Sequence, residues 1–359
     1  MFWFRITLAL ACPGACLLLG ACEGGERAPD ASDRPREGAT LIPGAMELVE
    51  RARSVELVGP RGRTVLERGE SGDRWRVPTL DGYAADWDAV RLATRGVADL
   101  RVVEARTTRP DRHAMLGLLD PREAGEGPGA PGEHGMLVRW LDDEGEELAS
   151  VILGDFEGES GLRRAARLAG RDEAWLVEGY TPVRTSAIEQ VRAQLTLLPR
   201  GRVGTVAIER PGDGLAIDAR RAHWQEPLRA VATSPHGRLR EASGEALESG
   251  LAYVPFLEVR TLDRAPVGGE PELTARYGLF EGATVTLRLY PGERAGDRWA
   301  TIGVEASDTI GGDDFPNPEG VREWLERRGE QWHGWAFRVP AEMLGVFLAE
   351  RGELLEDAE

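Results

Sequence analysis

The sequence predicts an α+β fold of two tandem, similar modules, each a mainly antiparallel sheet with helices packed on one face. Three observations support this prediction. Short β-rich segments recur along the chain, each half has one amphipathic helix that runs directly into a strand, and the same order of segments occurs twice. With 359 residues, 42% of them hydrophobic, the chain can bury two such cores. We expect the first module over residues 45–198 and the second over residues 199–359.

The N-terminal segment MFWFRITLALACPGACLLLGAC has one charge, an apolar run and small residues before Cys22. This layout is typical of a secretory signal, and the run is shorter than the roughly 18 to 20 residues of a membrane-spanning helix. The segment LGAC, residues 19–22, is similar to the lipobox of bacterial lipoproteins, which implies removal of residues 1–21 and acylation of Cys22. Cleavage before Cys16 fits less well, because Pro13 stands where the motif has a branched aliphatic residue. An ordinary signal with an incidental cysteine is the other alternative.

The lipobox similarity implies a location in the cell envelope. The protein would be held in the membrane by its N-terminal acyl chains and would face the periplasm. Glu23, rather than aspartate, follows the cysteine and favours the outer over the inner membrane. Residues 22–44 are rich in Gly, Pro, Ala and charge, which predicts a flexible tether. The net charge of −17 would repel phosphate backbones, so we expect no nucleic-acid partner.

The first module is expected to open with strands at VELVGPRG and DRWRV. Its helix is DAVRLATRGVADL, in which Val90, Ala93, Val97 and Leu100 form one apolar stripe, and RVVEA follows as a strand. Further strands are predicted at MLVRWLD, ELASVILG and EAWLVE. The polar turn DDEGEE between two of them favours antiparallel meanders.

The segment TPVRTSAIEQVRAQL, residues 181–195, is predicted to be a helix that connects the modules. The second module is expected to repeat the pattern, with strands around VAIERPGDGLAID, a helix at GEALESGLAYV that leads into FLEVRTL, and strands at ATVTLRLY, RWATIGVE and WAFRV. A later helix should begin with Asn317 as N-cap and Pro318 at its first position. The pairs Trp75 with Trp224 and Gly117 with Gly278 are the landmarks of the repeat.

The sequence predicts no catalytic residues and no cofactor. The five histidines lack metal-ligand spacing, so no metal site is predicted, and neither a nucleophile elbow nor a phosphate loop is present in the sequence. Asp313, in DTIGGDDF, could bind a hard cation, but a solvated acidic turn is the simpler interpretation. Trp332 and Trp335 could form a stacking platform for a ligand, although the preferred interpretation is that Trp335 fills the core of the second module.

The first half resembles a bacterial uncharacterised-domain family, number 4340. The residues that carry the resemblance are Trp75 and Pro78, the ADWDAV segment at 85–90, VADLRVVEARTTRP, the LGLLDP segment at 116–121, VILGD and AWLVEGY. The resemblance covers residues 55–195 and, more loosely, the second half. Leu119 and the long AGEGPGAPGEHG loop depart from the family pattern. The resemblance implies an extracytoplasmic accessory subunit of a gliding-motility-type ABC transporter, and it supplies no catalytic residues.

We therefore expect a non-enzymatic lipoprotein, tethered through Cys22, that acts as an accessory, binding or scaffolding subunit, with ABC-transporter membrane subunits as candidate partners. The alternative is a periplasmic glycan-binding protein or hydrolase that uses a cleft between the modules, lined by Trp332, Trp335 and Asp313.

Overall fold

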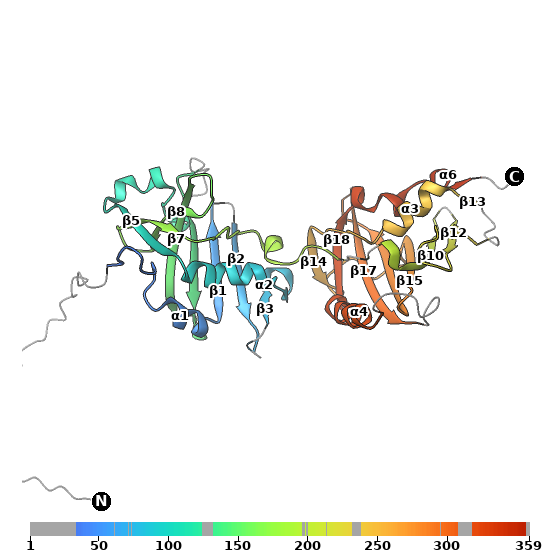
Figure 1. Ribbon diagram of the computed structural model, residues 1–359, viewed down its shortest axis with the longest axis horizontal. Coiled ribbons are helices and arrows are strands. Elements are labelled where there is room, and N and C mark those ends of the chain that lie inside the picture. Colours follow the sequence, from blue (N-terminus) through green and yellow to red (C-terminus); the bar gives the residue numbers. More distant parts are fainter. Residues whose placement is uncertain are drawn as a thin grey trace, which may run out of the picture.

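The computed structural model describes residues 34–356, except 61, 71, 73, 124–131, 196–197, 199, 213, 232–237, 295 and 308–317. Cys22, the predicted signal and Asp313 lie outside the described residues. Figure 1 shows an elongated molecule with one sheet in each half and an extended connector between them. Within the described residues, the fold is mostly β with a few helices, arranged as two antiparallel sheets of nine and eight strands.

The first sheet has the strand order β4-β3-β2-β1-β6-β7-β8-β9-β5. Its strands are β1 Ser54–Gly59, β2 Gly62–Arg68, β3 Trp75–Val77, β4 Tyr83–Ala84, β5 Arg101–Thr107, β6 Met136–Leu141, β7 Glu147–Glu157, β8 Arg163–Leu168 and β9 Ala174–Glu178. Helices α1 Ala45–Arg51 and α2 Trp87–Arg91 belong to this half, and a π turn, Leu92–Gly96, continues α2. The predicted stripe is buried, with Val90, Ala93, Val97 and Leu100 each at most 2% exposed.

The second sheet has the order β12-β11-β10-β15-β16-β17-β18-β14. Its strands are β10 Val203–Arg210, β11 Leu215–Arg220, β12 Arg229–Ala230, β14 Glu258–Thr261, β15 Leu273–Leu279, β16 Ala283–Pro291, β17 Asp297–Ala306 and β18 Trp335–Pro340. The helices are α3 Glu241–Ser249, α4 Pro318–Trp332, α5 Gly345–Leu348 and α6 Arg351–Leu354, and β13 Arg238–Leu239 pairs with β19 Leu355–Glu356. The described helices are all too short or too polar to span a membrane.

The two sheets share one strand order apart from the short edge strand β4. In each sheet, a hairpin (β1–β2 or β10–β11) lies beside a four-strand meander (β6 to β9 or β15 to β18), and the strand that follows a helix (β5 or β14) forms the far edge. The paired residues that the sequence suggested as repeat landmarks do not occupy equivalent strands. Gly117 lies in a turn and Gly278 within β15, and Trp75 is 8% exposed whereas Trp224 is 37% exposed. The landmark pairs are therefore wrong, because each pairs a residue within a strand, Trp75 or Gly278, with a residue outside the strands.

Two further predictions are corrected by the backbone. The tether predicted for residues 22–44 ends too late, because Gly38 N–H donates to Val102 O and Leu41 N–H to Leu100 O, each at 2.8 Å, and Leu41 is fully buried. The predicted connecting helix, residues 181–195, contains only the 3₁₀ turn Ala187–Gln190. Its remaining residues run as coil, and the Leu195 N–H donates to Val254 O at 3.0 Å in the second module.

Candidate functional site

The predicted ligand-binding tryptophans lie where the two modules meet. Trp332, at the end of α4, is 2% exposed and packs in the core, so it offers no open face to a ligand. Trp335, at the start of β18, lies with its ring centroid 5.0 Å from that of Tyr83 in β4 of the first module. This ring contact joins β18 of the second module to β4 of the first. The platform interpretation is therefore wrong for Trp332, and Trp335 contacts the other module.

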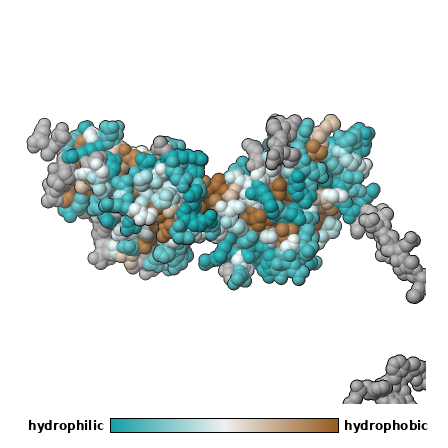
Figure 2. Space-filling view, turned by 180° about the vertical axis from the view of Figure 1, so that it is seen from behind, coloured by the Kyte–Doolittle hydropathy of each residue, from teal (hydrophilic) through white to brown (hydrophobic). Residues whose placement is uncertain are grey.

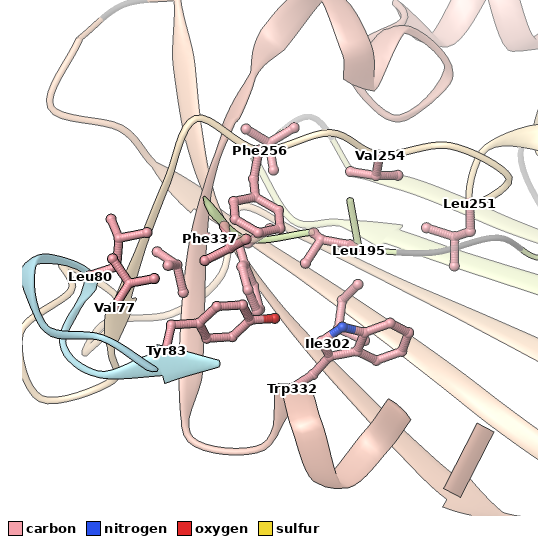
Figure 3. Close-up of a cluster of buried hydrophobic side chains, with 14 of the residues drawn as sticks. Val77, Leu80, Tyr83, Leu195, Leu251, Val254, Phe256, Ile302, Trp332 and Phe337 are labelled. Atoms are coloured by element: carbon pink, nitrogen blue, oxygen red, sulfur yellow. The ribbon is translucent and has the colours of Figure 1, made fainter. Parts of the chain in front are cut away.

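Tyr83 is the centre of this module junction (Figure 3). Its ring meets those of Phe256, Trp335 and Phe337 edge to face, with interplanar angles of 84° to 86° and centroid distances of 5.0 to 6.2 Å. Burial raises the pKa of the Tyr83 hydroxyl to about 12, although the Arg328 charge and a hydrogen bond with Gln331 partly oppose the shift. The hydroxyl is therefore neutral at ordinary pH, and the junction has an apolar centre.

Asp81 fastens the edge of the same junction. It is the only described non-glycine residue with a positive φ, 56°, and it lies in the turn between Leu80 and β4. Its Oδ2 accepts a hydrogen bond from the Thr261 N–H at 3.1 Å, and its Oδ1 forms an ion pair with Arg264. One carboxylate thus pairs with the backbone of edge strand β14 and with a side chain beyond that strand.

The connector adds backbone pairing to the junction. Besides the Leu195 bond, the Phe256 N–H donates to Ala193 O at 3.2 Å, and Gln194 forms a bridge with Pro255. Aromatic side chains, the Asp81 carboxylate (with its bonds to Thr261 and Arg264, which we call the Asp81 latch) and backbone hydrogen bonds therefore all connect the modules. Figure 2 shows hydrophobic residues gathered at the waist between the two modules.

The LGLLDP segment packs against one face of the first sheet. A Cβ atom at Gly154 would overlap the carbonyl oxygen of Leu116, and one at Gly135 would lie 2.7 Å from Gly117 O. Gly117 itself has φ +62°. Leu118 is fully buried in a small cluster with Ile152 on this face. These glycines let the segment lie directly on β6 and β7.

Asp120, the next-to-last residue of that segment, forms an ion pair with Arg122 at 2.6 Å. Burial acts to raise the pKa of the Asp120 carboxyl, but the hydrogen bonds from Arg122 outweigh it and hold the pKa below its usual value. The pKa of Glu147 is also lowered: burial opposes the shift, and hydrogen bonds from Ser150 and Arg139 outweigh it. Arg139 also pairs with the buried Glu56, so charged groups stabilise this face in pairs.

Two open concavities of about 710 Å³ each lie away from the junction. One, in the second module, is lined by arginines and glutamates in equal number around Leu273 and Leu348. The other, which we call the connector groove, lies in the first module between the start of β2, Thr79, the start of β6, the end of β7 and connector residues 182–187 and 189. Sequence reasoning missed this groove, because its residues were assigned to a helix. Among the described residues, no three His, Cys, Asp or Glu side chains are grouped to hold a metal.

Comparison with known proteins supplies the family. Searches of curated proteins and of solved structures found no match. The family model for a domain of unknown function, DUF4340, matches residues 75–279, from the start of β3 to the end of β15. The match includes Asp81, Tyr83, the LGLLDP segment and the whole connector. Because it covers more than half of the chain, this protein belongs to the DUF4340 family.

Proposed function

We propose that this protein is a non-enzymatic, membrane-anchored extracytoplasmic lipoprotein that acts as an accessory or scaffolding subunit, with an ABC-type transport assembly as its partner. We also propose that its two modules arose as a tandem repeat of one unit. The observation that supports the scaffolding role is the junction around Tyr83, which fixes two sheets of the same strand order in one body. Such a body holds two similar surfaces at a set separation, and it needs no cofactor.

The anchoring part of the proposal rests on the LGAC segment at 19–22 and on the polar residues that follow it. Acyl chains on Cys22 would hold the protein in the cell envelope, facing the periplasm, with the outer membrane favoured. Two acyl signals or more give stable anchoring, whereas one chain binds only reversibly.

Replacing Cys22 by alanine tests the anchor. We expect Cys22→Ala to leave the far-ultraviolet circular dichroism unchanged and to move the protein from the membrane fraction to the soluble fraction. Cys16→Ala is the matched control and should stay in the membrane fraction. A Cys22→Ala protein that detergent alone extracts would contradict the anchor, and release by Cys16→Ala would move the acylation site to that residue.

Crosslinking in cells, followed by affinity capture and mass spectrometry, tests the partner. Recovery of permease or ATPase-linked membrane subunits supports the accessory role. Recovery of only outer-membrane or peptidoglycan components would contradict a role in transport.

A further inference from the structure

Arg328 places a positive charge at the edge of the module junction. It lies on α4 of the second module, and its Nη1 donates to Oε1 of Gln331 at 2.8 Å. Gln331 is also the hydrogen-bond partner of the Tyr83 hydroxyl, so one side chain separates the guanidinium from the aromatic centre. The guanidinium carbon lies 5.6 Å from the ring centroid of Trp324, one helical turn earlier on α4. These contacts hold the charge in place on the second module.

Arg192 brings a second positive charge to the junction from the connector. The backbone around it is held on both sides, because Gln190 O accepts from the Asp86 N–H and Arg192 O accepts from the Gln194 N–H, each at 2.7 Å. Arg192 itself is exposed. Burial lowers the pKa of Arg328 from its usual value, and the charge of Arg192 lowers it further. The two guanidinium groups therefore lie close enough to repel each other.

Neither arginine is ion-paired with a carboxylate within the part of the chain that the structure describes. The charge of Asp86 raises the pKa of Arg328 and so partly offsets the repulsion, but Oδ1 of Asp86 accepts from the Asp88 N–H at 3.1 Å as the cap of α2. Carboxylates are plentiful in a chain with 61 acidic and 44 basic residues. Two like charges held together, one of them half-buried, leave a local excess of positive charge that a bound anion would neutralise.

We propose that Arg192 and Arg328 form a binding site for a phosphate group at the module junction. The oxygens of a phosphate point in several directions, so guanidinium groups on two separate elements can each donate to it. A free phosphate and the phosphate of a lipid headgroup both offer this chemistry. Because Arg192 belongs to the connector and Arg328 to α4, the bound anion strengthens the junction. The site goes beyond the proposed function, which assigns no ligand to the junction.

Isothermal titration calorimetry with inorganic phosphate tests the site on the purified full-length protein, with sodium chloride at equal ionic strength as the reference. We expect Arg192→Gln and Arg328→Gln each to weaken phosphate binding at least about tenfold, because each removes a charge-assisted contact. Arg192 is exposed, so its replacement leaves the fold intact. Arg95→Gln, at an exposed arginine of the first module, is the matched control and should change binding less than about twofold.

Urea unfolding supplies a second measurement. Phosphate should raise the midpoint of the wild type above its value in sodium chloride, and Arg192→Gln should abolish this difference. The proposal is overturned if phosphate and chloride act alike on the wild type, or if Arg192→Gln and Arg95→Gln bind phosphate equally well.

The source of the phosphate group is distinguished by flotation of Cys22→Ala with phosphatidylglycerol vesicles. Flotation that Arg192→Gln abolishes supports a lipid phosphate, and binding of inorganic phosphate without flotation supports a free one.

Discussion

Replacing Tyr83 by alanine should uncouple the two modules. The ring is 2% exposed, and its three ring contacts are all to residues of the second module. Truncation of a buried aromatic side chain costs about 3 to 5 kcal/mol, from lost burial and from the cavity left behind. Because these contacts cross the junction, the loss should fall on the coupling between the modules, with each separate core left intact.

Urea unfolding, followed by circular dichroism and by tryptophan fluorescence, measures this coupling. We expect the two signals to coincide in the wild type and to separate in Tyr83→Ala, with one module unfolding at lower urea. Tyr83→Phe keeps the ring and loses only the bond with Gln331, so it should cost about 1 kcal/mol. Tyr253→Ala, at a 55% exposed side chain, should change stability by less than about 0.5 kcal/mol. Coincident transitions in Tyr83→Ala, with a loss under about 1 kcal/mol, would refute the reasoning.

Three other predictions concern single residues. Gly154→Ala should destabilise the protein by about 2 kcal/mol or more in thermal unfolding, because the new Cβ meets the Leu116 backbone. Gly303→Ala, in strand β17 with open space around the new Cβ, should cost less than about 1 kcal/mol. Equal losses in the two variants would contradict the close packing at Gly154. The folded-state pKa of Asp120 is lowered, so its contribution is present above the unfolded value of 3.8 and is lost as the pH falls toward the folded value. Urea midpoints at pH 7 and pH 3 should therefore differ less in Asp120→Asn than in the wild type, and the same difference in both would exclude this contribution. Asp81→Ala should cost about 1 to 3 kcal/mol by leaving the Thr261 N–H unpaired, which the same urea assay measures; an unchanged midpoint would show that the latch is not needed.

Local patterns predicted much of the secondary structure. The stripe from Val90 to Leu100 predicted a buried helical segment, and alternating runs such as MLVRWLD predicted strands, because one-sided burial imposes a fixed period on the sequence. The antiparallel pairing followed from short polar turns. The family was also predicted from the sequence, and the match over residues 75–279 confirms it.

Local sequence patterns did not predict the extended connector or the contacts of the junction. The stripe of Ile188, Val191 and Leu195 has a helical spacing, but these residues share the segment with Pro182 and β-branched neighbours, and the backbone pairing with residues 254–256 prevails. The latch joins Asp81 to Arg264, far apart in the sequence, and no local period records such a contact. The only available signals were the Asp-Gly turn after Leu80 and the aromatic side chain that follows it.

If the junction around Tyr83 holds the two modules as one rigid body, the distance between a spin label on each module should have a single value. With Cys12, Cys16 and Cys22 replaced by alanine, the chain has no other cysteine, so labels can be placed only at Met115→Cys and Tyr253→Cys. These side chains are 82% and 55% exposed, one in each module. We predict one narrow distance distribution from pulsed electron paramagnetic resonance, which broadens when Tyr83→Ala is added. A broad or multiple distribution in the protein with Tyr83 intact would contradict the claim.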